Sequence, residues 1–371
     1  MPEPTPGNRS DQPHLPLSTG STLLRLAAIA VVVAVCAGAL AYVKGVFDPG
    51  RLTPEAFVDQ LQTDNGIHPG YRRNHAKGVC VVGYFESAAP IRPYSAAGVF
   101  QDARTPVVGR FALPTGSPYS PDTAAPIRSF ALRFTQADGQ QWRTGMNAMP
   151  SFPVATPQAF FDMLKASAPD PATGKPDPAA MGRFFGAHPE AAPFLAWVKT
   201  AKPSASYATE TYNSVNAFYL VGADGQRHAV RWSVVPQPGN GSSAPATQSG
   251  DFLDRDLQQH LANGPLRWDL RMTLADPADP VDDATRAWPA ERPVVAAGTL
   301  VIEKAEAQND GECRDINYDP LILPSGIQAS ADPLLPARSA AYASSYLRRT
   351  SEVDQLKTAH ADPQSAQEAR P

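Results

Sequence analysis

Short stretches of apolar residues recur along most of the chain, and their spacing predicts β-strands. Where apolar and polar residues alternate with a period of two, one face of a strand is buried and the other is polar. The alternation over 127–134 ends at Asp138-Gly139, a dipeptide typical of the tight turn in a β-hairpin. The strands predicted in this way cover 79–85, 105–113, 127–134, 141–143, 216–221, 228–235, 266–274 and 298–303.

Helices are predicted where apolar residues follow a three- and four-residue spacing. No segment repeats at a fixed period, and most of the strands fall into hairpins. The pattern therefore predicts an α+β fold, in which a closed antiparallel β-barrel of about eight strands carries inserted and C-terminal helices. The predicted helices cover 53–61, 157–165, 181–200, 251–263 and 340–356, whereas 318–338 has neither pattern and is expected to be a loop.

The longest apolar run lies near the N-terminus. Residues 26–43 are eighteen consecutive residues without a charge, flanked by Arg25 and Lys44, and this is long enough to cross a bilayer as a helix. The small residues at 37–41 also resemble a signal-peptide cleavage site, so a cleaved leader is the alternative. Because the run is longer than a usual signal-peptide core, we expect one N-terminal transmembrane helix.

An anchor divides the chain into four parts. We expect a disordered cytoplasmic leader over 1–25, a transmembrane helix over 26–46, a globular domain over 50–356 and a polar tail over 357–371. A short leader normally stays in the cytoplasm, so the single-pass protein would lie in the inner membrane with its globular domain in the periplasm. The net charge of −4 provides no basic surface of the kind that binds phosphate backbones, so nucleic acid is not an expected partner.

The chain has three cysteines, and only two of them fall in the globular domain. Cys36 lies inside the apolar run, which leaves Cys80 and Cys313. An oxidising compartment would allow a disulfide between these two. Cys80, however, lies on a predicted core strand, where free cysteine commonly packs as a small apolar side chain. We therefore favour two buried thiols.

A histidine precedes the strand predicted at 79–85. His75 would lie at the mouth of this strand, where side chains can reach a ligand cavity. Taken alone, such a histidine is more often a structural turn residue than a catalytic one. Its surroundings are more informative, because Arg72-x-x-His75-Ala-Lys-Gly, followed by Gly-Tyr-Phe-Glu at 83–86, resembles the signature of the catalases.

The resemblance to the catalase family extends from about residue 67 to residue 349 and rests on several separated motifs. It is strongest to the short catalase-related peroxidases, which lack the C-terminal regions of full-length catalases. Further matching motifs are Gly-Met-Asn-Ala-Met-Pro at 145–150, Asp-Phe-Leu-Asp-Arg-Asp-Leu at 251–257, Gly-Pro-Leu-Arg-Trp at 264–268, Asp-Ala-Thr-Arg-Ala-Trp-Pro at 283–289, Leu-Pro-Ser-Gly-Ile-Gln-Ala-Ser at 323–330 and Arg-Ser-Ala-Ala-Tyr at 338–342.

The resemblance implies haem b (heme b) as cofactor and assigns roles to individual residues. His75 would take a proton from hydrogen peroxide and return it to the leaving oxygen, while Asn147 would hold the peroxide by a hydrogen bond. Tyr342 would bind the iron as a tyrosinate. A phenol normally titrates near pH 10, so this ligand needs a neighbouring cation, which Arg338 would supply. The remaining implied cofactor contacts are the propionate-binding Arg72, Arg110 and Arg349, and Phe152 near the haem face.

These assignments have simpler alternatives. Arg72, Arg110 and Arg349 could each be a surface charge, and Tyr342 with Tyr346 could be an aromatic pair on the last helix. The chain also departs from the family pattern. Catalases usually have Arg-Phe-Ser where this chain has Arg-Phe-Ala at 110–112, which removes a hydroxyl that would bond the distal histidine. The usual Pro-Asp-Thr after the ligand tyrosine is Ala-Ser-Ser at 343–345, and no NADPH site carries over.

The expected function is a haem peroxidase that reduces hydrogen peroxide at the expense of an organic electron donor of unknown identity. Three alternatives stay open at this point: a true catalase that dismutates peroxide, a relative of allene oxide synthase acting on lipid hydroperoxides, and a haem carrier without activity. The membrane is the other expected partner, and a homo-oligomer is compatible with the sequence.

Overall fold

The computed structural model describes residues 19–43, 52–170, 172–202, 204–241 and 250–361. The chain forms two units, Met1–Thr53 and Pro54–Pro371, which are described separately. Residues 1–18 of the predicted leader and 362–371 of the predicted tail lie outside the described residues. The prediction of a disordered leader is wrong for 19–25, which are helical, and 357–361 of the tail are also helical.

The first unit contains one apolar helix, α1 (Thr19–Val43). Its segment Thr19–Tyr42 has a mean hydropathy of 2.5 and is long and apolar enough to cross a membrane, and none of it is buried. A signal sequence would have the same properties. The predicted transmembrane segment 26–46 overlaps this helix, except for 44–46, which lie outside the described residues.

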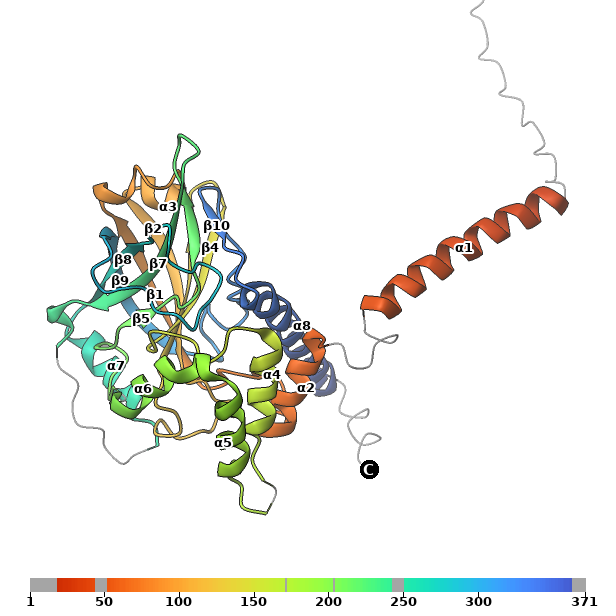
Figure 1. Cartoon of the computed structure of the whole chain (residues 1–371), viewed down its shortest axis with the longest axis horizontal. Helices are drawn as coiled ribbons and strands as arrows, with labels where there is room; N and C mark the ends of the chain where they lie inside the picture. Colours follow the sequence, from red (N-terminus) through yellow and green to blue (C-terminus); the bar gives the residue numbers. More distant parts are fainter. Residues whose placement is uncertain (1–18, 44–51, 171, 203, 242–249, 362–371) are drawn as a thin grey trace, which may run out of the picture. The chain divides into compact units, whose positions relative to one another are not determined.

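The second unit is built on an antiparallel barrel of eight strands (Figure 1). Neighbouring strands follow the order β7-β5-β4-β3-β2-β1-β9-β8, and pairing of β8 with β7 closes the barrel. Strand β6 pairs with β7, and β10 pairs with β6, which extends the sheet beyond the barrel. The predicted closed barrel is confirmed. The strands are β1 (Gly78–Ser87), β2 (Arg104–Ala112), β3 (Ser129–Thr135), β4 (Gln141–Asn147), β5 (Tyr212–Asn213), β6 (Phe218–Val221), β7 (Arg227–Pro236), β8 (Leu266–Leu274), β9 (Val294–Ala307) and β10 (Ile327–Ala329).

Aromatic side chains fill the barrel. The rings of Phe111 and Phe130, on neighbouring strands, stack with centroids 4.0 Å apart. Alternation along β4 shows how the sequence separates the two faces: Trp142, Thr144 and Met146 are buried, whereas the residues between them face the other way. The outward face of β4 therefore remains available for the helix that packs against it.

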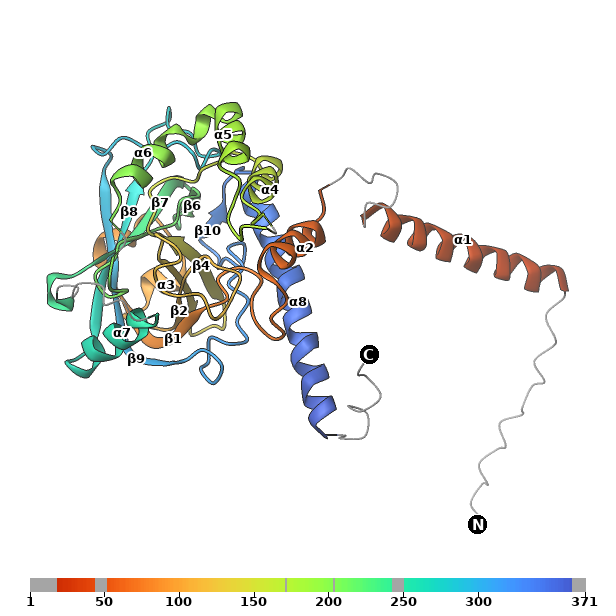
Figure 2. The same cartoon turned by 90° about the horizontal axis from the view of Figure 1, so that it is seen from below.

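That helix is α8 (Leu334–Ala361), the longest helix of the second unit among the described residues. Two views show α8 running along one side of the barrel next to α2 (Figure 2). The hydrogen bond from Arg338 Nη2 to the carbonyl of Gly145, at 3.2 Å, fixes its N-terminal part against β4. The other helices are α2 (Pro54–Asn65), α3 (Gly98–Gln101), α4 (Pro157–Ala166), α5 (Pro178–Ala187), α6 (Ala192–Thr200) and α7 (Phe252–Ala262).

Two of the sequence-based boundaries are wrong. The helix expected over 181–200 is two helices, because the chain leaves helical geometry at His188 and Pro189 starts a separate turn. The loop expected over 318–338 contains β10 and the first residues of α8. Arg338 is therefore helical, like Tyr342 one turn later.

The expectation of two free thiols is also wrong. Cys80 and Cys313 form a disulfide, with their Cα atoms 5.3 Å apart, and both residues are fully buried. The bond joins β1 to the loop after β9, across 233 positions of sequence. Cys36 of α1 is a free, exposed thiol.

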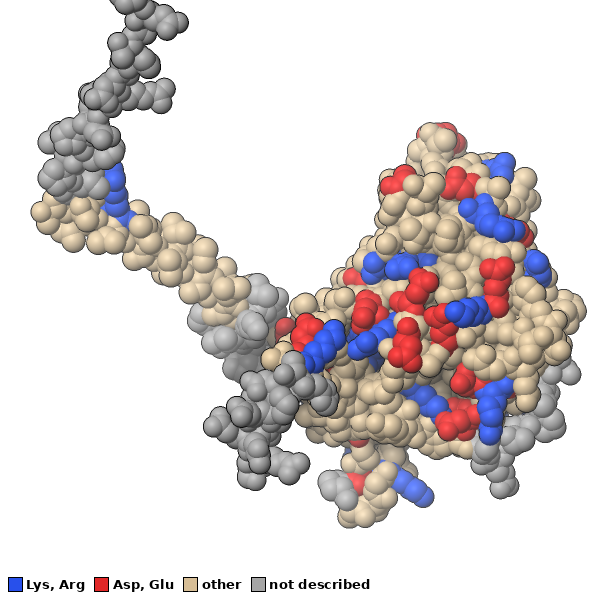
Figure 3. Space-filling model, turned by 180° about the vertical axis from the view of Figure 1, so that it is seen from behind, with Lys and Arg blue, Asp and Glu red and all other residues tan. Residues whose placement is uncertain are grey.

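Basic and acidic side chains are interspersed over the face of the second unit seen in Figure 3. Surface pairs such as Arg104 with Glu86, at 2.8 Å, are exposed and contribute little to stability. The chemically informative charges are the buried ones, described next.

Candidate functional site

His75 lies in the loop that leads into β1, and this loop is fixed on both sides. The amide of Ala76 donates to the carbonyl of Thr115 at 2.8 Å, and Lys77 Nζ lies 2.7 Å from the buried carboxylate of Asp122. The backbone of His75 has φ = 56°, in the left-handed region that non-glycine residues rarely adopt. The side chain of Asn74 accepts a hydrogen bond from the His75 amide at 2.9 Å. The neighbouring contacts thus sustain a conformation that costs about 1–3 kcal/mol.

The imidazole of His75 is placed to remain neutral. Burial, followed by the charges of Arg110, Arg338 and Arg72, lowers the pKa of His75 to about 3. Its Nδ1 is buried and has no hydrogen-bond partner in the described part of the chain. A neutral imidazole can accept a proton from a bound acid at neutral pH.

Arg110 of β2 extends alongside this loop. Its guanidinium is buried, and Nη2 donates to the carbonyl of Ala76 at 3.2 Å and to Gln308 Oε1 at 2.5 Å. A Cβ atom at Gly78 would lie 2.3 Å from the carbonyl oxygen of Phe111 and 2.6 Å from Arg110 Cζ, so glycine is needed there for the backbone of β2 and for the guanidinium. Neither contact partner of Arg110 carries a charge.

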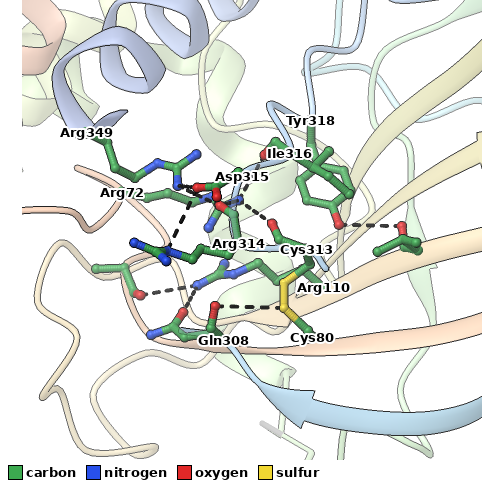
Figure 4. The surroundings of a disulfide bond; sticks show 12 residues. Arg72, Cys80, Arg110, Gln308, Cys313, Arg314, Asp315, Ile316, Tyr318 and Arg349 are labelled. Atoms are coloured by element: carbon green, nitrogen blue, oxygen red, sulfur yellow. Dashed lines mark hydrogen bonds and ion pairs between the residues drawn. A yellow bond between two sulfur atoms is a disulfide. The ribbon is translucent and has the colours of Figure 1, made fainter. Parts of the chain in front are cut away.

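Two more arginines meet at the loop that follows β9 (Figure 4). Arg72 Nη2 donates to the carbonyls of Cys313, Arg314 and Ile316 at 2.9–3.2 Å. Arg349 of α8 donates to the carbonyl of Arg314 at 2.6 Å, so the two guanidinium groups share one acceptor. Arg349 also lies 3.3 Å from the largely exposed carboxylate of Asp315.

The three guanidinium groups repel one another. Burial and the charges of Arg110 and Arg349 hold the pKa of Arg72 well below its usual value, and burial lowers the pKa of Arg110 to about 10. Burial likewise lowers the pKa of Arg349. The buried Nε atoms of Arg110 and Arg349 have no partner among the described residues. Such a cluster favours an anionic ligand, which would supply the missing opposite charge.

Tyr342 and Arg338 face the outer side of β4. Arg338 Cζ lies 5.9 Å from the centroid of the Tyr342 ring. An ideal Cβ at Gly145 would lie 3.4 Å from Arg338 Nη2 and 3.7 Å from the Tyr342 hydroxyl. Glycine therefore leaves a space beside this phenol that any other residue would begin to fill. Tyr346 instead lies under Arg349, so each tyrosine faces its own arginine.

A buried polar chain continues from Arg338. Its Nη1 donates to Asn216 Oδ1, and Asn216 Nδ2 donates to the carboxylate of Asp332 at 2.7 Å. Burial raises the pKa of Asp332, and the hydrogen bond from Asn216 opposes that rise. Sequence reasoning missed both Asn216 and Asp332, because 116 positions separate them and neither lies in a recognisable motif.

Asn147, at the end of β4, points to the same outer face as Gly145, two residues earlier. Its Oδ1 accepts a hydrogen bond from Ser129 Oγ at 2.6 Å. Ser129 lies directly opposite Asn147 on one side and opposite Ala112 of β2 on the other. The hydroxyl absent at Ala112 is therefore present on the next strand, where it serves Asn147. Ser129 was not identified from the sequence.

Phe152 packs against α4. Its ring packs 5.5 Å from that of Phe160 on α4, and its amide donates to the carbonyl of Ala284 at 2.8 Å. Among the described residues, no ring contact or hydrogen bond joins it to His75 or Tyr342.

Two groups of predicted residues are thus brought close together. His75 is near the charges of Arg72, Arg110 and Arg338, although the loop before β1 and helix α8 are far apart in sequence. Arg72 and Arg349 meet at one carbonyl. The surface-charge interpretation is wrong for Arg110 and Arg349, which are 3% and 2% exposed.

A family model described as Catalase matches residues 50–369. The catalase-related peroxidase of Synechococcus elongatus is 37% identical over 302 residues, which cover 81% of this chain and 89% of the relative. The catalase-related peroxidase of Mycolicibacterium paratuberculosis is 31% identical over 305 residues, covering 81% of this chain and 96% of the relative.

The solved structure of catalase A from Saccharomyces cerevisiae aligns with a TM-score of 0.69 and 22% identity, covering 79% of this chain and 64% of that one. A second structure, of a bacterial catalase, aligns with a TM-score of 0.68 at 23% identity. It covers 81% of this chain and 62% of that one. At this identity the likeness shows the fold, and the chain spans less than two thirds of either catalase.

Proposed function

The chain belongs to the catalase family, whose members are oxidoreductases acting on peroxide, and we propose that it is a haem-dependent peroxidase. It would reduce hydrogen peroxide with electrons from an organic donor. The similarity to two catalase-related peroxidases over most of their length supports this assignment over that of a full-length catalase.

The residues present fit a haem. Tyr342 can provide an anionic oxygen ligand, with Arg338 beside it and with no side chain at Gly145 between the phenol and β4. Haem carries two carboxylates, which match the excess positive charge of Arg72, Arg110 and Arg349 and the unpartnered Nε atoms of the last two. The approach of the Tyr342 hydroxyl to Gly145, two residues before Asn147, is the observation that carries the proposal.

When bound, the haem supplies the two-electron redox chemistry that peroxide reduction requires. The chain itself moves protons and holds the substrate. Neutral His75 accepts a proton from hydrogen peroxide at its ring and returns it to the leaving oxygen, which departs as water. With Asn147 Oδ1 engaged by Ser129, its Nδ2 is left to donate to the peroxide. The polar chain of Asn216 and Asp332 holds Arg338 beside the phenol.

A donor assay tests the proposal directly. Full-length protein purified in detergent and reconstituted with haem b is mixed with hydrogen peroxide and a phenolic donor, and donor oxidation and oxygen release are measured together. A parallel reaction supplies a lipid hydroperoxide in place of hydrogen peroxide. We expect ready donor oxidation with weak oxygen release. Full catalase rates without donor oxidation would identify a dismutase, and turnover of only lipid hydroperoxides an allene-oxide-synthase-like enzyme. Haem binding without any turnover would identify a carrier.

We further propose that α1 is a single-pass anchor in the inner membrane, with the second unit in the periplasm. Two observations support this placement. α1 is long and apolar enough to cross a bilayer. The Cys80–Cys313 disulfide is typical of an oxidising compartment, since cytosolic thiols are kept reduced.

A further inference from the structure

The Cys80–Cys313 disulfide lies among the three clustered arginines. Cys80 is directly opposite Arg110 in the pairing of β1 with β2. Cys313 belongs to the loop after β9, and its own carbonyl accepts a hydrogen bond from Arg72 at 3.0 Å. The loop after β9, which Cys313 ties to β1, accepts hydrogen bonds from all three guanidinium groups: from Arg72 and Arg349 through its carbonyls and from Arg110 through the side chain of Gln308 (Figure 4).

Backbone carbonyls hold two of these arginines. The carbonyls of Cys313, Arg314 and Ile316 accept from Arg72, and that of Arg314 also accepts from Arg349. The positions of both guanidinium groups thus follow the position of the loop 313–316. A carbonyl offers only a partial negative charge, so it orients these cations without neutralising them.

The loop is attached to the barrel by apolar contacts, hydrogen bonds and one covalent bond. Ile316 and Tyr318 pack with Val108 and with the two cysteines in a small cluster beneath the loop. Next to this cluster, Arg143 of β4 donates to the carbonyl of Asn317 at 2.5 Å. The covalent bond joins Cys313 to β1. Mutual repulsion among Arg72, Arg110 and Arg349 acts to separate the groups that these attachments keep together. The covalent bond withstands this repulsion, whereas the non-covalent contacts of the loop can give way.

We propose that the Cys80–Cys313 disulfide is a positioning element of the cofactor site. It fixes the 313–316 carbonyls relative to β1, and thereby holds Arg72 and Arg349 beside Arg110 in an arrangement suited to the carboxylates of haem. This inference rests on the proposed function, because it takes haem as the anion. Reduction would add two electrons and two protons, break the sulfur–sulfur bond and leave two thiols, after which the loop is held by non-covalent contacts alone.

Haem affinity measured by absorbance titration of the full-length cofactor-free protein tests the inference. We expect the Cys80→Ala/Cys313→Ala variant to bind haem at least about tenfold more weakly than the wild type, because misplaced guanidinium groups lose charge-assisted hydrogen bonds to the carboxylates. Val230→Ala, at a fully buried core position on β7, is the control for destabilisation alone. It should keep wild-type affinity at temperatures where circular dichroism shows both variants folded.

A double-mutant cycle separates positioning from general stabilisation. Arg72→Gln should weaken haem binding clearly in the wild type and much less in the background without the disulfide, where Arg72 is already misplaced. Equal effects in both backgrounds, or unchanged affinity in the Cys80→Ala/Cys313→Ala variant, would overturn the inference. If that variant does not fold, wild-type protein reduced with a phosphine and then alkylated gives the same comparison. A wild type that binds no haem refutes the proposed function itself, whereas normal wild-type binding with unaffected variants refutes only the positioning role.

Discussion

Ser129 donates its hydroxyl hydrogen to Oδ1 of Asn147 across 2.6 Å, between neighbouring strands of the barrel. This bond fixes which end of the amide can donate, since an amide whose oxygen already accepts presents its nitrogen as the remaining polar group. The opposite residue on β2 is Ala112, and His75 Nδ1 has no partner among the described residues. The hydroxyl of Ser129 thus orients the Asn147 amide, whereas no hydrogen bond among the described residues orients His75 Nδ1.

Ser129→Ala is expected to lower the rate of peroxide reduction by about 2- to 10-fold, which is the rate change that corresponds to the net free energy of one ordinary hydrogen bond. Ser129→Thr, which keeps a hydroxyl, should retain most of the rate. Ser95→Ala removes a buried hydroxyl that bonds the carbonyl of Gly326 and serves as the matched control. Steady-state kinetics of the haem-loaded variants check this. A loss in Ser95→Ala equal to that in Ser129→Ala would point to a general effect on folding.

Ala112→Ser is expected to shift the balance of activities toward oxygen release. In the catalase pattern a hydroxyl at this position bonds the distal histidine; here position 112 is buried and His75 Nδ1 has no partner among the described residues. Dismutation requires a tightly oriented second peroxide. A misplacement of about 1 Å can cost roughly a hundredfold in a positioned reaction. The ratio of oxygen release to donor oxidation is the measurement. His75→Ala should abolish both activities. An unchanged ratio in Ala112→Ser would show that the missing hydroxyl at position 112 does not set the balance of activities.

Tyr342→Phe is expected to lose haem or bind it at least about tenfold more weakly while the barrel stays folded, because it removes the anionic ligand. Tyr346→Phe, one turn later on α8 and under Arg349, is the control and should bind haem normally. Arg338→Leu should weaken binding by removing the cation beside the phenol. Absorption spectra of the reconstituted variants check all three. An unaltered ferric spectrum in Tyr342→Phe would mean that another residue binds the iron.

The stability of the cofactor-free protein should depend on pH through His75. Its pKa is lowered from 6.5 to about 3 by burial and by nearby arginines. Between these values the unfolded chain binds a proton that the folded chain does not, so the free energy of unfolding falls as the pH decreases below about 6.5. Above that pH the histidine contributes nothing.

Denaturant titrations at pH 7.5 and pH 5.0 measure this effect. His75→Gln should lose less stability than the wild type between the two conditions, by about 2 kcal/mol, since one pKa unit is worth about 1.4 kcal/mol. His68→Gln, which changes a partly exposed histidine of the same segment, should behave like the wild type. If the wild type and His75→Gln lost the same free energy of unfolding between the two pH values, the burial of a neutral imidazole would be contradicted.

The full-length protein should stay in the membrane fraction after a carbonate wash. α1 offers an apolar segment from Thr19 to Tyr42, which is enough to resist extraction. Protein sequencing of the mature N-terminus is the decisive control. A chain that starts near Tyr42 would show that the segment is a cleaved signal.

Periodicity predicted most of the barrel, because a strand with one buried face repeats every two residues. The alternation over β3 and the Asp138-Gly139 turn gave the hairpin with β4 directly. Strand β5 has two residues and β10 has three, too few for any period to appear. Their place follows from neighbouring strands, and so only the folded chain reveals it.

Candidate site residues could be predicted where they lie in a sequence motif. They could not be predicted where only the strand pairing brings them together. Motifs led to His75 and Tyr342. The register that places Ser129 between Ala112 and Asn147 is a property of the sheet, not of any one segment. The pairing of Cys80 with Cys313 likewise depends on the path of the loop after β9, which local sequence does not determine.

The pairing of β1 with β9 has a consequence for how the protein is made. β1 ends at Ser87 and its partner β9 ends at Ala307, so during synthesis the barrel stays open until more than two hundred further residues have emerged. Long-range pairing of this kind is slow to form and leaves an apolar strand edge exposed in the meantime. Arg72 and His75 emerge early, whereas Arg338 and Tyr342 emerge after the last strand. A nascent or prematurely terminated chain therefore carries only half of the proposed cofactor-binding residues, and the proposed peroxide chemistry would require a nearly finished polypeptide.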